Sequence, residues 1–426
     1  MISSIRFLKV EGYQIFDFKE FLSKGYIEVH LERKGGEGWK CSRCGENLDT
    51  QRGKYRVRVE GLPITNFKTY YTLWRYKGHC FKCKKARTEA SAFISKETPH
   101  LTQDYAWWIG RLCEIGAVSR VAELTGQDPM TTWRLDFARI KRMLTFYKIP
   151  KATRISVDEV YSRKKQKFSG ESRDERFFTV VSDLDTRRVI WVSSGRRKES
   201  LDQFFILIGK EACEKIKVVA MDLHDPYKAS VKEHCPNATV VWDRFHVMQI
   251  FEQAVNETRK DLHAEQARGS DLHRLTRGGF RFLFLKKASR RTEEEKNHID
   301  DVLKENEYFA KLELIKERML TIFYQPDEKE AKTIFTEVGD WIWQCGFEPL
   351  KKWYRNFEKG WETFKNYFKY RVTSSLSEGT NNVIKALKRR GFGYRNMEYF
   401  KLKIMQICGY LNSKYVSQQF HALTLF

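Results

Sequence analysis

Three acidic residues in distant segments of the sequence have the types and settings that phosphodiester chemistry requires: Asp158, Asp222 and Glu378. Asp158 stands inside a run of β-branched residues, Asp222 ends a second such run, and Glu378 lies in a stretch with helical pattern. Cutting or joining a phosphodiester bond builds negative charge on the attacking and leaving oxygens, and two hard cations about 4 Å apart stabilise both. Mg²⁺ prefers carboxylate oxygens held on rigid elements. If the three side chains converge, they suit a site for two Mg²⁺ ions, for which Mn²⁺ can substitute.

The residue pattern leaves open which of two neighbouring acids is used on each strand. Glu159 follows Asp158 directly, and Asp225 comes shortly after Asp222. Both strands look buried on both faces, so the pattern does not separate the members of either pair. With 55 acidic residues in the chain, spacing alone is weak support, and each acid also fits an exposed turn or helix N-cap.

Four of the nine cysteines form two Cys-x-x-Cys pairs, Cys41 with Cys44 and Cys80 with Cys83. Each pair offers two thiolates from one tight turn, and two such turns complete a tetrahedral zinc site with sulfur–zinc distances of about 2.3 Å. The 35 residues between the pairs exceed the usual spacing and fit a β-hairpin carried between them. The alternative is four buried thiols in a β core. For the solitary cysteines in mostly apolar settings, packing is the favoured interpretation: Cys113, Cys213, Cys235, Cys345 and Cys408.

The charge balance favours a polyanionic partner. Lys and Arg number 78 against 55 Asp and Glu, a formal net charge of +23, and nucleic acid is the commonest polyanion that neutralises such a surplus. A generally basic, soluble protein is the plainer alternative. Hydrophobic residues (41%) and aromatic residues (14%) suffice for packed cores, which excludes a largely disordered chain. No stretch has the pattern of a membrane span or signal peptide, so we expect no membrane contact, a cytoplasmic location and reduced cysteines.

The length of 426 residues predicts several domains rather than one core. Residues 1–95 alternate short strand-like runs, such as Tyr26–Leu31 and Lys68–Trp74, with turns, and predict a small zinc-ribbon-like β unit. Residues 96–150 predict three helices, the last two joined by a Gly-bearing turn, as in a DNA-binding helix-turn-helix; an ordinary three-helix bundle has the same pattern. The helices are expected over Asp104–Ile115, Val118–Leu124 and Met130–Lys141, and the recognition helix would begin with Met130, Thr131, Thr132, Trp133 and Arg134.

Residues 151–247 predict a mixed sheet. Three strand-like runs, Arg154–Val160, Phe177–Asp183 and Val189–Ser193, make an antiparallel meander. A helix over Glu199–Ile216, a strand over Lys217–Asp222, a helix over Tyr227–His234 and a strand over Thr239–Asp243 follow. The order β, β, β, α, β, α, β is that of a ribonuclease-H-like sheet, in which the fourth strand lies beside the first. This topology would bring Asp158 and Asp222 onto neighbouring strands.

The last two segments are predicted to be helical. Residues 248–370 lack strand pattern, and an aromatic cluster in their second half is more often a helix core than a surface for stacking bases: Trp341, Trp343, Phe347, Trp353, Tyr354, Phe357, Trp361 and Phe364. Residues 371–426 contain a predicted helix over Thr373–Gly391. Its Glu378, Asn382, Lys385 and Arg389 share one face. We interpret Asn382 and four cations of this helix as contacts to DNA phosphates rather than a solvated face: Lys385, Lys388, Arg389 and Arg390.

At these residues the sequence resembles the DDE transposases of bacterial insertion sequences, specifically those of the ISL3 type, over nearly its whole length. The first block of similarity is Ser156-Val-Asp-Glu159 with Gly195, Arg196 and Glu199. The second is Asp222 with Pro226 and Tyr227, followed by Asp243-Arg-Phe-His246. The third and most specific is Glu378-Gly-Thr-Asn381-Asn382 with Ile384, Lys385, Lys388, Arg389, Gly393, Tyr394 and Asn396. Leu223 and His224 depart from the family's pattern, which leaves Asp222 in place and affects only neighbouring contacts.

The resemblance implies that Asp158, Asp222 and Glu378 are the metal ligands, and that the helical stretch between Asp243 and Glu378 is an insertion into a ribonuclease-H-like core. It implies a transposase in the bacterial cytoplasm, associated with the nucleoid, which binds terminal inverted repeats and joins cleaved 3'-hydroxyl ends to target DNA. Both substrates are double-stranded DNA, and pairing two ends requires a homodimer or larger assembly. His246, with Asp243, is expected either to contact the scissile phosphate or orient a water, or to tie the insertion to the sheet.

Two other functions are consistent with the residues. One is a DNA-binding regulator with a zinc ribbon, a helix-turn-helix and an inactive nuclease-like domain. The other is a structure-specific nuclease of the same fold.

Overall fold

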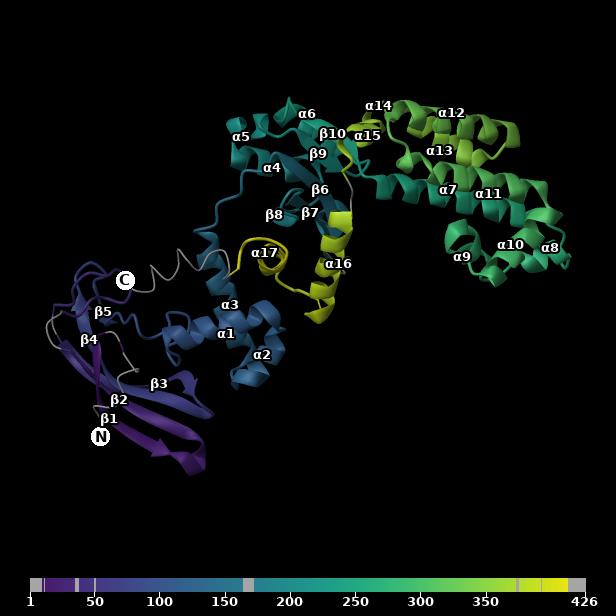
Figure 1. The fold of residues 1–426 in the computed structure, drawn as a ribbon. Coiled ribbons are helices and arrows are strands. Elements are labelled where there is room, and N and C mark those ends of the chain that lie inside the picture. Colours follow the sequence, from purple (N-terminus) through teal and green to yellow (C-terminus); the bar gives the residue numbers. More distant parts are fainter. Residues whose placement is uncertain are drawn as a thin grey trace. The chain divides into compact units, whose positions relative to one another are not determined.

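A computed structural model describes residues 10, 12–34, 38–49, 51–163, 172–372, 375–391 and 393–412, and the side chains of residues 51, 52 and 375–378 lie outside this description. The chain has a mixed α/β architecture and divides into two compact units (Figure 1). The first combines residues 1–147 with residues 388–426, and the second spans residues 148–387. Each unit contains a five-stranded sheet.

The sheet of the first unit has one apolar face. Alternate residues of β2, Ile27, Val29 and Leu31, are buried in a core with Val59 of β3 and Leu73 of β4. The segment after β5 contributes Phe93 and Ile94 to the same core. The strand order is β1-β2-β4-β3 with β5 paired to β4, and only the β2–β4 pair is parallel. The strands are β1 (Tyr13–Phe21), β2 (Tyr26–Arg33), β3 (Gln51–Ile64), β4 (Phe67–Cys80) and β5 (Lys85–Thr88).

Strands β3 and β4 form the hairpin expected between the two cysteine pairs. They are antiparallel, and Thr65 in their turn has a positive φ of 54°. β4 runs on to Cys80, well past the predicted Lys68–Trp74. Aromatic and charged side chains on its open face, among them Trp74, hide the simple alternation of polar and apolar residues that marks a half-buried strand.

The described part of the first unit also contains four complete α-helices. Gly126 ends α2 with a left-handed φ of 67°, and Asp128 caps α3 by accepting a hydrogen bond from the backbone N–H of Thr131 at 2.9 Å. The fully buried Asp136 of α3 accepts hydrogen bonds from the Tyr399 hydroxyl at 2.6 Å and from Lys403 Nζ at 3.1 Å. These contacts fix α17 against α3 through a paired buried charge. The helices are α1 (Gln103–Ile115), α2 (Val118–Thr125), α3 (Pro129–Leu144) and α17 (Met397–Ile407).

The sheet of the second unit has the strand order β10-β9-β6-β7-β8, and β9, its fourth strand along the sequence, lies beside β6, its first, as predicted. β6, β7 and β8 form an antiparallel meander, β9 lies parallel beside β6, and β10 lies parallel beside β9. The strands are β6 (Arg154–Tyr161), β7 (Phe177–Asp183), β8 (Arg188–Ser194), β9 (Val218–Met221) and β10 (Thr239–Trp242).

The single helix expected over Glu199–Ile216 is instead two helices, α4 (Lys198–Ile208) and α5 (Lys210–Glu214). Gly209 separates them with φ 81° and ψ 162°, a conformation that residues with a Cβ rarely adopt. The prediction of one continuous helix was therefore wrong, because Gly209 interrupts it. α4 packs on β8 and on α6 (Asp225–His234).

From Arg244 to Tyr370 the chain is helical and contains no strand, as predicted; this whole stretch is described. In Figure 1 these helices are the green group around α7 and α11. They are α7 (Arg244–Ala264), α8 (Asp271–Leu275), α9 (Phe280–Leu285), α10 (Glu293–Glu305), α11 (Glu307–Leu320), α12 (Glu328–Cys345), α13 (Glu348–Lys359), α14 (Trp361–Phe364) and α15 (Asn366–Tyr370).

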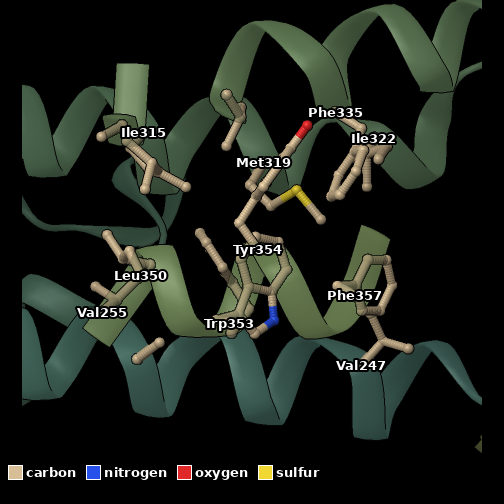
Figure 2. Packing of buried hydrophobic residues seen from close by; sticks show 14 of the residues in the cluster. Val247, Val255, Ile315, Met319, Ile322, Phe335, Leu350, Trp353, Tyr354 and Phe357 are labelled. Atoms are coloured by element: carbon tan, nitrogen blue, oxygen red, sulfur yellow. The ribbon is translucent and has the colours of Figure 1, made fainter. Parts of the chain in front are cut away.

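The aromatic cluster of this helical stretch forms its core. Phe335 is fully buried and stacks on Tyr354 at 4.5 Å between ring centroids and on Trp361 at 5.0 Å. Figure 2 shows α13 residues between Val247 of α7 and Met319 of α11. Trp343 is 45% exposed, and Trp341 is half-buried. The core interpretation is confirmed for the buried members: Phe347, Trp353, Tyr354, Phe357, Trp361 and Phe364.

Truncating Phe335 is expected to weaken this core strongly. Phe335→Ala should lower the free energy of unfolding by about 3–5 kcal/mol, because it removes buried apolar surface and leaves a cavity. The matched change of an exposed ring, Trp343→Ala, should cost less than about 1 kcal/mol. Urea unfolding followed by circular dichroism measures both. Equal losses in the two variants would contradict the core assignment.

No helix among the described residues combines the length and apolar character needed to cross a membrane. The solitary cysteines fit the packing interpretation, since Cys113, Cys213 and Cys235 are buried and Cys345 and Cys408 are half-buried.

Candidate active site

Three aspartates stand in register on three neighbouring strands. β6 pairs with β9 up to Val157↔Met221, and β9 pairs with β10 up to Met221↔Trp242. Asp158, Asp222 and Asp243 are the next residues along the three chain segments. Parallel strands lie about 4.8 Å apart, and residues in register point to the same face. The backbone therefore brings the three carboxylates to one end of the sheet.

The three carboxylates line a small cavity together with His246. Its volume of about 10 Å³ is enough for about one water molecule. Asp158 and Asp243 are each only 8% exposed. The three acids thus line one cavity at this end of the sheet, and two of them are buried.

Burial raises the pKa of Asp158 to about 6, and the carboxylate of Asp222 adds to the rise; His246 and the hydrogen bonds from Glu159 and Asn381 oppose it. Burial also raises the pKa of Asp222, and Glu159 adds to that rise. Two neighbouring carboxylates repel each other when both are ionised, and a nearby cation stabilises their ionised forms. The donor set therefore fits a hard divalent metal ion, which takes carboxylate oxygens.

Helix α16 (Ser375–Arg390) reaches this end of the sheet through Asn381. Asn381 Nδ2 donates a hydrogen bond to Asp158 Oδ2 at 2.8 Å, while Asp158 Oδ1 accepts from the Glu159 backbone N–H at 2.7 Å. From the sequence, Asn382 was predicted to make a functional contact and Asn381 was not; in the structure Asn382 is exposed. Spacing could have indicated Asn381. On a helix, the residues three and four positions after Glu378 both lie on the same face as Glu378.

The backbone of Glu378 lies in the first turn of α16, one turn before Asn381. The prediction that Glu378 is a metal ligand concerns a side chain outside the described residues. Along the rest of the helix, Lys385, Arg389 and Arg390 are exposed and Lys388 is partly exposed. Arg390 Nη1 also donates to the carbonyl of Ile115 at 2.9 Å.

The acids that the sequence pattern left open have different contacts in the structure. Glu159 accepts hydrogen bonds from Arg196 Nη1 at 3.0 and 3.2 Å, and Arg196 Nε donates to Asp174 at 2.8 Å. Asp225 stands in the first turn of α6, where a carboxylate stabilises the helix. Of the four described candidates, Asp158 and Asp222 line the cavity. Arg196, which neutralises Glu159, was not singled out by charge or spacing.

Asp243 has a structural role that leaves its second oxygen near His246. Asp243 Oδ1 caps α7 by accepting from the Phe245 backbone N–H at 2.9 Å, and Oδ2 lies 3.8 Å from His246 Nε2. The His246 side chain is 30% exposed and lines the cavity. Both interpretations of Asp243 and His246 therefore have a physical basis. The Asp243 cap ties α7 to the sheet, and the His246 imidazole lies at the cavity that the acids line.

The four paired cysteines form one cluster, the only group of three or more potential metal ligands at close spacing among the described side chains. Their Sγ atoms all lie within 4.8 Å of one another, with 3.4 Å between Cys44 and Cys80 and 3.9 Å between Cys41 and Cys83. Tetrahedral zinc with bonds of about 2.3 Å places its sulfurs about 3.8 Å apart. The cluster therefore has the dimensions of a four-cysteine zinc site.

The two cysteine turns are built alike. The residue after each pair has a positive φ, 74° at Gly45 and 53° at Lys84. Burial opposes ionisation of Cys41, but backbone N–H groups of Cys44 and Arg43 and the adjacent thiols outweigh it and lower the Cys41 pKa to about 6. The Cys83 backbone N–H favours the Cys80 thiolate, yet burial and the other thiols raise the Cys80 pKa to about 12. All four thiolates can form together only beside a cation.

The start of α3 presents some of the predicted recognition residues and buries one. Met130 is 53% exposed and Arg134 is exposed, whereas Trp133 packs on Tyr399 at 5.9 Å between ring centroids. Thr131 is partly exposed. Thr132 is fully buried, and its hydroxyl donates to the Asp128 carbonyl at 3.1 Å. The buried Thr132 side chain offers no surface to DNA, which argues against the predicted DNA contact of this residue.

Comparison with known families bears directly on these sites. A family model of the DDE type named for ISL3 and described as "Transposase" matches residues 155–404. This span includes the strands of all three aspartates, the helical stretch and α16. The chain belongs to the ISL3 family of DDE transposases. Membership confirms the family and the enzyme class that the sequence predicted.

Curated relatives of this ISL3-family transposase have the same kind of name. The transposase for insertion sequence element IS1001 of Bordetella parapertussis is 25% identical over 364 residues, which cover 85% of this chain and 87% of the relative. The transposase for insertion sequence element IS1557 of Mycobacterium tuberculosis, found in two strains, is 23% identical over 317 residues, 69% of this chain and 68% of the relative.

For an ISL3-family transposase, DNA is the substrate and divalent metals serve catalysis. The cavity acids provide carboxylates of the kind that such metals take. The cysteine cluster is compatible with a separate zinc ion.

Proposed function

We propose that this enzyme cleaves the ends of an insertion sequence and transfers the freed 3'-hydroxyls to target DNA at a two-metal site formed by Asp158, Asp222 and Glu378. The observation that carries the proposal is the 2.8 Å hydrogen bond from Asn381 to Asp158, which joins the late helix to the acidic strand end. Glu378 precedes Asn381 by one helical turn, so both lie on one face of α16. In this proposal the second unit is a ribonuclease-H-like core, and α7 to α15 are its insertion.

The residues of the site would hold the metal ions and fix their geometry. Asp158, Asp222 and Glu378 would bind two Mg²⁺ ions, or Mn²⁺ in their place, and the ions would stabilise charge on the attacking and leaving oxygens. Asn381 and the Glu159 backbone N–H each engage one oxygen of Asp158. A carboxylate oxygen can accept more than one interaction, so this clamp orients Asp158 and leaves lone pairs for a metal.

His246 is proposed to contact the scissile phosphate or to orient the attacking water. Because Asp243 caps α7, it sets the position of His246 one turn into that helix and keeps the imidazole at the cavity. The same contact also ties the helical insertion to the sheet, so the pair serves positioning as well as chemistry.

The proposed DNA contacts lie on two helices. α2 and α3 form a helix-turn-helix for the terminal inverted repeats, with Thr131, Arg134 and the edge of Trp133 at the start of α3. On α16, Asn382 and the basic residues hold phosphates of the cleaved end: Lys385, Lys388, Arg389 and Arg390. The net charge of +23 favours this substrate. Two ends must be held together, so we propose a homodimer or larger assembly.

The third acid is tested by changing Glu378 to Gln. Glu378→Gln should reduce cleavage of end DNA by about 10³-fold, because a metal-ligand carboxylate contributes several kcal/mol to stabilising the transition state. Affinity for the terminal repeat should stay within about twofold, since the change is isosteric. Gel-shift and nicking assays on one labelled duplex measure both quantities.

Glu398→Gln is the matched control. Glu398 also lies in a carboxyl-terminal helix but pairs with Lys141 at the surface, at 3.2 Å. Its variant should cut and bind like the wild type. If Glu378→Gln loses binding together with cleavage, Glu378 is structural and the proposed third ligand is wrong.

A further inference from the structure

The open face of the amino-terminal sheet carries a row of aromatic rings. Even-numbered residues of β4 point away from the apolar core, so Tyr70, Trp74 and Tyr76 share this face. Trp74 is 46% exposed. On the adjacent strand, Tyr26 meets Tyr70 edge to face at 5.6 Å between centroids. Trp74 is the exposed ring of this row and Tyr26, Tyr70 and Tyr76 are partly exposed, and apolar surface gathered in this way on a folded protein marks an interaction surface.

Cations from strand β3 lie directly beside these rings. Lys54, Arg56 and Arg58 point to the same face as the rings, and all three are exposed. The Arg58 guanidinium lies 3.8 Å from the centroid of the Tyr70 ring and 5.0 Å from that of Tyr26. Lys54 Nζ lies 4.9 Å from the Trp74 ring. The rings and cations thus alternate across two neighbouring strands.

The acids on this face have partners of their own. Glu28 accepts a hydrogen bond from the Thr72 hydroxyl at 2.5 Å, and Glu60 lies 3.7 Å from Lys68. Asp17 lies 3.6 Å from Lys19. The two ion pairs offset Glu60 and Asp17, which leaves the three β3 cations in excess over Glu28 and Glu32 of β2.

We propose that this face binds single-stranded DNA. A base would stack on the exposed Trp74 ring, beside the partly exposed Tyr26 and Tyr70, and the β3 cations would neutralise the phosphates, which is the combination that binds unpaired strands without reading their sequence. A duplex hides the faces of its bases in its own stack, so open rings favour an unpaired strand. The inference rests on the proposed function, because strand cleavage at an element's end frees a terminus that can unpair from its complement.

The test is the affinity of the full-length protein for a fluorescent oligothymidylate of about 12 nucleotides, within the site sizes of roughly 4–16 nucleotides found for single-strand binders. Trp74→Ala should weaken binding about tenfold, and Trp74→Phe should restore most of it because stacking is kept. Arg58→Ala should weaken binding and reduce the slope of log affinity against log salt by about 0.7.

Lys77→Ala is the matched control. Lys77 lies 5.0 Å from the Tyr55 ring, so it forms the same kind of cation–ring pair, but on the opposite face of the hairpin. Its variant should bind the oligothymidylate within about twofold of the wild type. Equal losses for Lys77→Ala and Trp74→Ala would overturn the proposal, as would unchanged binding in Trp74→Ala and Arg58→Ala.

A second arm measures binding of the terminal-repeat duplex by the same variants. Trp74→Ala should leave duplex affinity within about twofold; a tenfold loss for the duplex would assign the face to paired DNA and overturn the single-strand inference. Cleavage by the wild-type preparation is scored separately. If the wild type fails to cleave but the variants differ in oligothymidylate affinity as expected, only the proposed function is contradicted. If the wild type cleaves and all variants bind the oligothymidylate equally, only the inference about the sheet face is contradicted.

Discussion

Replacing Asp158 by Asn is expected to reduce metal-dependent cutting of end DNA by about 10³-fold or more, because it removes a carboxylate from the proposed two-metal site. The variant should remain folded, since Asn has the same shape and its carbonyl can still accept one of the two hydrogen bonds that Asp158 accepts, from Asn381 or from the Glu159 backbone N–H. The change also removes one of two neighbouring acids, the buried Asp158 and the half-buried Asp222, whose pKa values burial raises. Single-turnover nicking and thermal unfolding without metal measure the two effects.

Glu159→Gln is the control for Asp158→Asn, because it makes the same chemical change one residue along β6. Glu159 pairs with Arg196, and it is not one of the described residues that line the cavity. Cleavage should fall by less than about tenfold in this variant. If Glu159→Gln is the inactive variant and Asp158→Asn cuts normally, the assignment of the first metal ligand is wrong.

Loss of the zinc site is expected to have the second large effect. Cys80→Ser should remove bound zinc, unfold the amino-terminal sheet and abolish binding of the terminal repeat. Structural zinc binding is worth about 10–16 kcal/mol in zinc-finger peptides, as much as the whole stability of a typical domain. Cys80 closes the hairpin at the end of β4 and is fully buried, so the sheet depends on its placement. Zinc content by atomic absorption and gel-shift binding measure the result.

Cys345→Ser serves as the control for this change, since Cys345 is half-buried in α12, away from the cluster in sequence and unit. That variant should retain one zinc per chain and normal repeat binding. A Cys80→Ser protein that keeps both zinc and its folded sheet would show that the four cysteines form a packed thiol core instead.

The sheet of the second unit followed from the sequence because its strands are short β-branched runs separated by turn residues. Their order also fixed the neighbours, so the placement of Asp222 beside Asp158 was predictable. The aromatic cluster of the insertion was likewise predictable as core, since helical spacing of large rings outweighs the chance of an open stacking surface.

What the sequence did not reveal depends on contacts between distant segments or on single backbone angles. Periodicity does not register the left-handed φ of Gly209, which splits one predicted helix into two. The burial of Thr132 follows from the packing of α3 on its neighbours, although its helix position suggested exposure. The contact of Asn381 with Asp158 joins residues 223 positions apart, and no local pattern encodes such a pair.

The most direct test of the proposed function is cleavage of a labelled duplex that carries the element's terminal repeat and its flank. The proposed two-metal site predicts a cut at the element boundary that leaves a 3'-hydroxyl, requires Mg²⁺ or Mn²⁺, stops with EDTA and is lost when the repeat is scrambled. Tight binding of the repeat without any cut in either metal would contradict it and favour a regulator. Equal cutting of intact and scrambled repeats would contradict it in favour of a structure-specific nuclease.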